Sequence, residues 1–450
     1  MSQGFWTLDR VQEALGGGPG GARSIHAIST DTRTLQRGDL FVALRGERFD
    51  AHDYLPEAVA LGAAGLVVHH IPRGSRLGVP IYEVPDTLVA LGQLATYWRR
   101  AWGKPVIAIA GSNGKTTTKD ITAAALSTRY AVHATTGTLN NRVGVPLTLL
   151  AAPPAADLAV VEVGTSLPGE VAILRDIVHP DIAVVTSVAE EHLEGLGDLA
   201  GVLREESSIY DGVELGIAPA AQPEVVHEAR VRARTAVAAG LDDGDFRAAS
   251  WRVGADALGQ IEVEGIVVRP PIRGTHTLRN AMLSLAVARA CGVSMEDAAR
   301  GIEQMPAPKM RAAWLALGRA RLINDAYNAN PGSTRAAFEL LRASCGDRQR
   351  VIVLGTMREL GPRSDALHEE IAQLAVETGD VVAGVGEFAS ALNRVRKDGV
   401  TVVTASDVDE LWLALEPHLA PNALILLKAS RGVRLERMVP YLEAWAAKAA

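Results

Sequence analysis

The sequence predicts an α/β protein of three domains, and three observations support this fold class. The chain has 450 residues, about three times the usual size of a single domain. Short apolar runs alternate with alanine-rich helical stretches along most of its length, which is typical of parallel sheets covered by helices. Segments unfavourable to helix interrupt this alternation at Gly103-Lys104-Pro105 and Pro306-Ala307-Pro308. We therefore predict domains over residues 1–103, 104–312 and 313–450.

The elements of the first two domains follow from local patterns. Apolar runs of strand length and helical periodicities, the last ended by Gly103, make the first domain a small α/β unit. The second has continuously apolar runs, as expected for strands buried on both faces. Strands are predicted at 40–44, 66–68, 106–110, 158–161 and 182–185, and helices at 55–64, 87–102, 280–291 and 295–304. Within residues 211–270 only 261–268 reads as a strand.

The third domain repeats the alternation of strands and helices in a shorter chain. This pattern predicts a doubly wound, Rossmann-like sheet. Its strands are predicted at 321–324, 351–354, 381–385, 400–403 and 424–427.

The composition excludes several classes of function. Hydrophobic residues make up 48% and charged residues 22% of the chain, as in ordinary globular proteins, and no apolar run reaches the roughly 18 residues that span a bilayer. A formal net charge of −7 argues against a general nucleic-acid-binding surface, so an anionic ligand needs a specific pocket. The two cysteines lack disulfide or zinc spacing. We expect a cytoplasmic monomer with no nucleic-acid partner and no membrane insertion.

The sharpest chemical signal is a phosphate-binding loop. The apolar run 106–110 leads into Gly111-Ser112-Asn113-Gly114-Lys115-Thr116-Thr117, and a helical stretch follows. Glycines let backbone N–H groups approach phosphate oxygens, the lysine supplies a positive charge, and Thr116 can ligate Mg²⁺. The sequence therefore predicts a nucleotide site at residues 111–117.

Polar residues after other strands are weaker candidates for the same edge of the sheet. Glu162 directly follows the run 158–161, where a carboxylate can reach a metal-bound nucleotide. His192 follows the next strand, and its position by itself favours a surface histidine over a ligand. Further polar clusters occur at 324–333 and 428–432, and hydroxyl and charged residues gather at 29–33 and 50–53. Helix capping or a solvated surface accounts for these as well as ligand binding does.

Taken together, these motifs resemble the Mur ligases, the ATP-dependent amide-forming enzymes of peptidoglycan synthesis. The resemblance covers nearly the whole chain, and within the family it is greatest to the branch that uses D-alanyl-D-alanine. Its elements are Thr30-Asp31-Thr32-Arg33, the loop 111–118, Asn140-Asn141, Glu162-Val163-Gly164, His192-Leu193-Glu194-Gly195, Asp325-Ala326-Tyr327-Asn328-Ala329-Asn330 and Lys428-Ala429-Ser430-Arg431-Gly432.

The resemblance implies a role for each domain. The first would bind the UDP of a nucleotide precursor, the central domain ATP and Mg²⁺, and the third the incoming amine. ATP would be held by Gly111, Ser112, Asn113, Gly114, Lys115, Thr116, Thr117, Asn280, Arg311 and Asp325, and the metal by Thr116, Glu162 and His192. The precursor would contact Thr30, Asp31, Thr32, Arg33, His52, Asn140 and Asn141, and the dipeptide Tyr327, Asn328, Asn330, Ser430 and Arg431.

The implied reaction joins D-alanyl-D-alanine to UDP-N-acetylmuramoyl-tripeptide. A carboxylate resists attack by an amine, so ATP first converts it to an acyl phosphate, and the amine then displaces phosphate. Phosphoryl transfer needs neutralised charge and alignment, which Lys115 and Mg²⁺ can supply. Lys115, Glu162, His192 and Glu206 are the residues implied to be catalytic.

Glu206 is a departure from the family pattern. The family has at this position a lysine carbamylated by CO₂ that bridges metal ions. A glutamate carries the same charge and the same ligating oxygens, but its side chain is shorter by about 4 Å. Thr277, Thr356 and Ala429 are smaller departures.

Three alternatives remain at the level of the sequence. The family enzyme that adds a single amino acid is disfavoured because its Asp-Asn-Pro-Arg signature is absent. Another amide ligase of similar build is disfavoured by the N-terminal motifs. A non-catalytic nucleotide-binding relative is motivated by Glu206. The third residue of the tripeptide and the extent of domain closure are not encoded in a readable motif.

Overall fold

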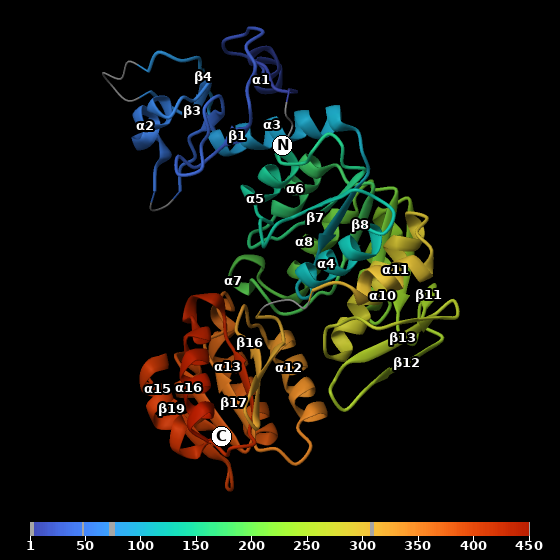
Figure 1. The fold of residues 1–450 in the computed structure, drawn as a ribbon, viewed down its shortest axis with the longest axis vertical. Helices are drawn as coiled ribbons and strands as arrows, with labels where there is room; N and C mark the ends of the chain where they lie inside the picture. The colour runs from blue at the N-terminus through green and yellow to red at the C-terminus, as the bar shows by residue number, and fades with distance from the viewer. Residues whose placement is uncertain (1–3, 47–48, 72–76, 307–309, 450) are drawn as a thin grey trace.

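The structure, a computed structural model, describes residues 4–46, 49–71, 77–306 and 310–449. Figure 1 shows three units in chain order along the long axis of the molecule, with the central one between the other two. Ala307 and Pro308 of the expected linker lie outside the described residues.

The N-terminal unit is a small parallel sheet with helices. Its strands are ordered β1-β2-β3-β4, and every neighbouring pair is parallel. The last helix, α3, is capped by Asp86 and ends at Gly103, which has a φ of 62°. It packs on α1 and also on α5 and α6 of the next unit, so it joins the two (Figure 1). The elements are α1 (Leu8–Leu15), β1 (Ile28–Ser29), β2 (Leu40–Val42), α2 (Leu55–Ala60), β3 (Gly65–Val68), β4 (Ile81–Glu83) and α3 (Thr87–Trp102), with a 3-10 turn at Ala51–Tyr54.

The central unit contains a seven-stranded parallel sheet ordered β11-β10-β9-β8-β5-β7-β6. Alternate residues of β5 face opposite layers, because strand side chains alternate. Ile107 and Ile109 pack with α4 and α10, whereas Val106 and Ala108 pack with the helices of the other face. The elements to β9 are β5 (Val106–Ala110), α4 (Lys115–Leu126), β6 (Val132–Ala134), α5 (Gly144–Leu150), β7 (Leu158–Glu162), α6 (Glu170–Val178), β8 (Ile182–Val185), α7 (Leu193–Leu196), α8 (Leu199–Ser207), the 3-10 turn Ser208–Tyr210 and β9 (Leu215–Pro219).

Residues 211–270, in which the sequence predicts a single strand, form a helix and several strands. They add strands to the edge of the main sheet and build a separate three-stranded antiparallel sheet ordered β12-β13-β14. The prediction of one strand over 261–268 was wrong. Glu264 and Gly265, with φ values of 51° and 81°, turn the chain between two strands, as in tight hairpins. The remaining elements are α9 (Pro223–Arg232), β10 (Thr235–Gly240), β11 (Phe246–Arg247), β12 (Ser250–Val253), β13 (Gly259–Val263), β14 (Ile266–Val268), α10 (Thr275–Ala290) and α11 (Met295–Glu303).

The C-terminal unit has a six-stranded sheet ordered β15-β16-β20-β17-β18-β19, parallel except for the pair β15–β16. Helices cover both of its faces, which confirms the α/β fold class. The sequence did not predict β15. The elements are β15 (Ala313–Leu317), β16 (Ala320–Asp325), α12 (Pro331–Ser344), β17 (Arg350–Leu354), α13 (Ser364–Thr378), β18 (Val381–Val385), α14 (Glu387–Arg394), β19 (Thr401–Ala405), α15 (Val408–Leu415), β20 (Leu424–Lys428) and α16 (Val439–Ala449), with 3-10 turns at Gly361–Arg363, Glu416–His418, Arg431–Val433 and Leu435–Met438.

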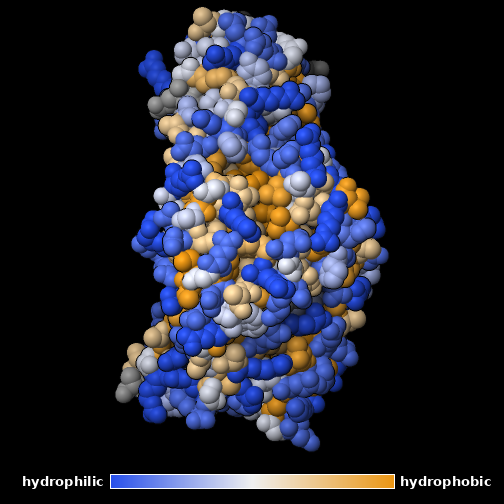
Figure 2. Space-filling model, turned by 90° about the vertical axis from the view of Figure 1, so that its right-hand side faces the viewer, coloured by the Kyte–Doolittle hydropathy of each residue, from blue (hydrophilic) through white to orange (hydrophobic). Residues whose placement is uncertain are grey.

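The surface is mainly hydrophilic on the face shown in Figure 2, and its hydrophobic residues gather over the middle of the molecule. Within the described ranges, none of the helices has both the length and the apolar character needed to cross a membrane.

Candidate active site

A cavity of about 810 Å³ lies where the central and C-terminal units meet. The carboxyl ends of β5, β7 and β8 form one wall, because these strands are neighbours in the sheet. The opposite wall comes from the C-terminal unit. Among the residues that line the cavity are Ser112, Asn113, Gly114, Lys115, Thr116, Thr117, Asn140, Asn141, Glu162, Glu191, His192, Asn280, Arg311, Asp325, Tyr327, Asn328 and Lys428. The structure therefore brings together most of the residues predicted to bind ATP.

The segment after β8 holds the phosphate-binding loop through hydrogen bonds. The N–H groups of Ser112 and Asn113 donate to Ser187, at 2.7 and 3.1 Å, and the N–H of Gly111 donates to Glu206 at 2.7 Å. These three donors are occupied, so the N–H groups at the start of α4 remain for phosphate.

Two glycines of this loop are required by the geometry. Gly111 has a φ of 118°, and a Cβ there would lie 2.4 Å from the Thr186 hydroxyl. Gly114, with a φ of 89°, would place a Cβ 2.8 Å from the amide of Asn280. Both positions combine a positive φ with a close neighbour, so larger residues would displace the loop.

Lys115 begins α4 and lies among carboxylates. Its amine donates to the carbonyl oxygens of Gly111 and Ser112 and lies 3.6 Å from Glu191 Oε1. Burial alone would lower the pKa of this amine, but the surrounding carboxylates outweigh burial and raise the pKa, Glu191 most and then Glu206. Lys115 therefore stays a cation, ready to neutralise phosphate charge.

Two oxygens beside the loop suit a magnesium ion. Thr116 Oγ1 and Glu162 Oε2 are buried and have no hydrogen-bond partner among the described residues, while Asn140 donates to the other Glu162 oxygen at 2.8 Å. No three His, Cys, Asp or Glu side chains converge on a metal position in the described chain. Thr116 Oγ1 and Glu162 Oε2 themselves fit Mg²⁺, which typically uses one or two carboxylates and keeps water or phosphate as its other ligands.

His192 is paired across the domain interface. Its Nδ1 contacts the Glu359 carboxylate of the C-terminal unit, and His192 itself has a φ of 52°. Burial alone would lower the pKa of the imidazole, but the bond to Glu359 raises it. In this arrangement His192 is a contact between the two units through Nδ1, and its predicted role as a metal ligand stays a prediction.

Glu206 contacts the phosphate-binding loop but does not line the cavity. One oxygen accepts the Gly111 N–H, and the other is buried with no partner among the described residues. Burial raises the pKa of this carboxyl from 4.5 to about 7, although the charge of Lys115 opposes the shift.

A Glu206→Gln variant should be more stable than the parent at high pH. The unfolded chain ionises this carboxyl near 4.5 and the folded chain near 7, so between these values the folded state binds more protons and stability falls as pH rises. We expect a gain of about 3 kcal/mol at pH 8 and little difference at pH 4.5, since glutamine still accepts the Gly111 N–H. Thermal unfolding of both proteins in EDTA at the two pH values tests this. An equal difference at both would contradict it.

The remaining residues predicted to contact ATP lie around the cavity. Asp325 ends β16 opposite Lys428, its register partner on β20, and the two form an ion pair at 2.5 Å. Asp325 also accepts the N–H of Ala312 at 3.0 Å. The guanidinium of Arg311 lies 4.3 Å from the centre of the Tyr327 ring.

The residues predicted to bind the UDP precursor fall into two groups. Asn140 and Asn141 line the cavity, and Asn141 also accepts the N–H of Gly144 at 2.9 Å, at the start of α5. Thr30, Asp31, Thr32 and Arg33 follow β1 in the N-terminal unit, outside this lining. Hydrogen bonds from Arg33 lower the pKa of Asp31, and the two form an exposed ion pair at 2.6 Å.

His52 is only 2% exposed, and its ring nitrogens are occupied. Nδ1 bonds Asp50 at 2.6 Å, and Nε2 accepts the N–H of His69 at 2.9 Å. The ring thus holds its loop against the end of β3 and offers no free nitrogen to the precursor.

The residues predicted to bind the dipeptide also differ in position. Tyr327 and Asn328 line the cavity, and the Tyr327 hydroxyl donates to Thr138 at 2.8 Å. Ser430 is 3% exposed and bonds backbone atoms of Arg358 and Ala329. The Arg431 side chain is exposed beside Glu436, and Asn330 is buried at the domain interface.

Sequence reasoning missed several residues of this site. Glu191 faces Lys115, yet the sequence signal for it was only its position beside His192. Gln222 pairs with both backbone groups of Val188, at 2.8 and 2.9 Å, and so fixes the segment after β8. His276 lines the cavity, and the sequence marked it only as the residue before Thr277.

The chain matches family models along most of its length. They are the Mur ligase family catalytic domain over residues 24–99, the Mur ligase middle domain over 109–288, and the Mur ligase glutamate ligase domain over 310–431.

Individual relatives cover nearly the whole chain. The UDP-N-acetylmuramoyl-tripeptide--D-alanyl-D-alanine ligase of Escherichia coli is 35% identical over 97% of this chain and 98% of its own. The Bacillus subtilis protein of the same name is 34% identical over 92% of each chain. A MurF crystal structure from Acinetobacter baumannii has a TM-score of 0.88 at 31% identity, covering 98% of this chain and 99% of its own. MurF from Thermotoga maritima in complex with ADP has a TM-score of 0.83 at 26% identity, covering 94% and 98%. With family models matching in all three units and relatives about a third identical from end to end, this chain belongs to the Mur ligase family.

Proposed function

We propose that this chain joins D-alanyl-D-alanine to UDP-N-acetylmuramoyl-tripeptide, using ATP and releasing ADP and phosphate. The observation that carries the proposal is the cavity in which the phosphate-binding loop faces Asp325, Tyr327 and Lys428 of the C-terminal unit. Such an arrangement can hold a nucleotide on one unit and an acceptor on another. The names of the relatives support the identity of both substrates.

The residues fit the two steps of this reaction. A carboxylate oxygen of the tripeptide attacks the γ-phosphorus of ATP, ADP leaves, and an acyl phosphate forms. Lys115 and the N–H groups at the start of α4 stabilise the charge on the transferring phosphoryl group. Mg²⁺, held by Thr116 and Glu162, would neutralise phosphate charge when bound. The amine of the dipeptide then attacks the acyl carbon, loses a proton, and phosphate leaves from the tetrahedral intermediate.

Three domains with separate tasks complete the proposal, with boundaries at 1–103, 104–312 and 313–450. Thr30–Arg33 and the asparagines Asn140 and Asn141 bind the precursor, and Tyr327 and Asn328 bind the dipeptide. We place the protein in the cytoplasm, because ATP and nucleotide-linked precursors are made there, and we propose that it acts as a monomer.

The reaction is tested by phosphate release from ATP with Mg²⁺, UDP-N-acetylmuramoyl-tripeptide and D-alanyl-D-alanine. Each organic substrate is omitted in turn, D-alanine alone replaces the dipeptide in one arm, and the product is weighed by mass spectrometry. We expect release only with both substrates, and a product heavier by one dipeptide less water. Nucleotide binding without release in any arm would contradict the proposal and indicate a non-catalytic relative.

A further inference from the structure

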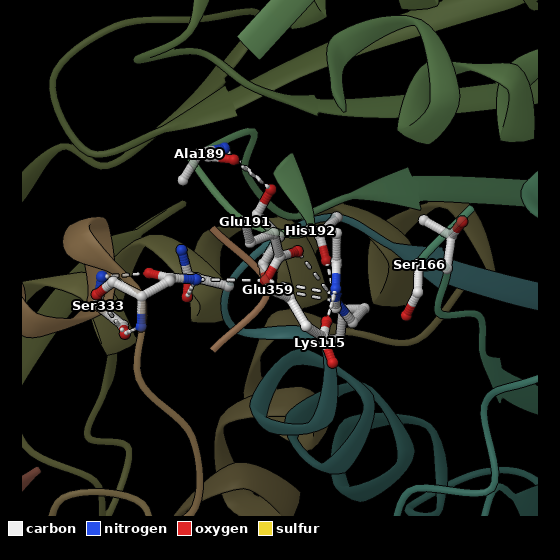
Figure 3. A network of polar contacts seen from close by, with 12 residues as sticks. Lys115, Ser166, Ala189, Glu191, His192, Ser333 and Glu359 are labelled. Atoms are coloured by element: carbon white, nitrogen blue, oxygen red, sulfur yellow. Dashed lines mark hydrogen bonds and ion pairs between the residues drawn. The ribbon is translucent and has the colours of Figure 1, made fainter. Parts of the chain in front are cut away.

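Consecutive residues after β8 contact the C-terminal unit, and we call residues 190–194 the docking segment. Glu190 pairs with Arg363 at 2.6 Å, His192 contacts Glu359, and the Glu194 N–H donates to the Glu359 carbonyl at 3.2 Å. Figure 3 shows Glu191 and His192 pointing toward Lys115, with Glu359 beside them. The docking segment therefore directly follows Ser187 and Ala189, which hydrogen-bond the phosphate-binding loop.

Asn330 is a buried contact from the C-terminal side. Its Oδ1 caps α12 by accepting the Ser333 N–H at 2.8 Å, which leaves its amide nitrogen directed at the central unit. This nitrogen donates to Asn113 Oδ1 at 2.9 Å and to Glu191 Oε2 at 3.2 Å. With 3% of Asn330 exposed, the amide joins the phosphate-binding loop to the docking segment.

The two carboxylate oxygens of Glu191 have different neighbours. One oxygen accepts from Asn330, and the other lies 3.6 Å from the Lys115 amine. This second oxygen is buried and has no hydrogen-bond partner among the described residues. A buried carboxylate is costly without a cation or a donor, so its orientation depends on both neighbours.

We infer that Glu191 is a positioning residue that couples docking of the C-terminal unit to the phosphate-binding lysine. Asn330 holds one carboxylate oxygen and thereby directs the other at Lys115, while its second hydrogen bond sets Asn113. When the C-terminal unit leaves, Glu191 and Asn113 lose this donor together. The inference deepens the proposed function, but its contacts exist without either organic substrate.

The test reverses the donor and acceptor roles of Asn330 and Glu191. Asn330→Asp keeps a good helix cap but places a carboxylate against Glu191, so we expect the units to separate and the radius of gyration from small-angle X-ray scattering to rise. Adding Glu191→Gln restores a donor–acceptor pair with reversed roles, because the glutamine amide donates to the introduced aspartate. We expect the double variant to return to the compact form. Asn328→Asp, the same change at an exposed position of the same loop, should leave the radius unchanged.

A separate measurement tests the contact between Glu191 and Lys115. Glu191→Gln alone still accepts from Asn330, so the compact form should persist, but the charge competing with phosphate for Lys115 is gone. We expect ADP to bind about fivefold more tightly by calorimetry, with a lower kcat in the phosphate-release assay because Lys115 is no longer directed.

Three outcomes would each overturn the inference in proteins that melt like the parent. They are an Asn330→Asp variant that stays compact, a double variant that stays expanded, and an unchanged ADP affinity in Glu191→Gln. All are measured with ADP or without ligand, so they are independent of which acceptor the enzyme uses.

Discussion

Replacing Lys115 by methionine should lower the kcat of the proposed reaction by about 10³-fold. The lysine begins α4 at the wall of the cavity formed by the phosphate-binding loop, and its pKa is raised, so it is charged at any working pH. Methionine has a similar length but no charge. The γ-phosphoryl group would then lose a donor aimed at the charge that develops as it is transferred, which is the main contribution a protein makes to this chemistry.

Single-turnover phosphate release with saturating ATP measures this effect apart from binding. Removing the lysine also leaves Glu191, Glu206 and Glu162 without their cation, so thermal unfolding should be recorded for each variant. Lys104→Met, at an exposed position before β5, is the matched control and should retain the parental rate. A folded Lys115→Met variant within tenfold of the parent would show that another group neutralises the phosphate.

Glu162→Gln should lower kcat by about 10²- to 10³-fold and raise the Mg²⁺ concentration needed for half-maximal rate. The glutamine keeps nearly the same shape, and its carbonyl oxygen can still accept the hydrogen bond from Asn140 that Glu162 accepts at 2.8 Å. What it loses is the negative charge on the second oxygen, which is buried and has no hydrogen-bond partner among the described residues. A neutral amide is a poorer ligand than a carboxylate for a hard cation.

A titration of initial rate against Mg²⁺ at fixed ATP separates the two effects. Glu224→Gln, on the exposed start of α9, removes the same charge away from the cavity and should leave the curve unchanged. An unaltered Mg²⁺ dependence in Glu162→Gln would place the ion elsewhere.

Local patterns predicted the parts of this molecule that depend on neighbouring residues. The helix at 87–102 agrees with α3 at both ends, because Asp86 caps it and Gly103 stops it. The strand at 106–110 and the glycine loop behind it were readable because a buried strand, a turn and a helix start each leave a signature within a few positions. The segment 211–270 left few such signatures, since β11 has only two residues and β12 is largely exposed, so neither shows the apolar run of a buried strand.

By itself, then, the sequence determined the α/β class, the phosphate-binding loop and the acid at the end of β7. Only the tertiary structure decided which distant residues contact the residues of the site. Glu206 bonds a loop N–H from 95 positions away, His192 meets Glu359 across 167 positions, and Asn330 reaches Glu191 across 139. Local periodicity carries no information about such pairs, because the first forms only when α8 has packed on the central unit, and the other two only when the C-terminal unit has docked. A carboxylate or an imidazole acquires its pKa, and with it its role, from those neighbours.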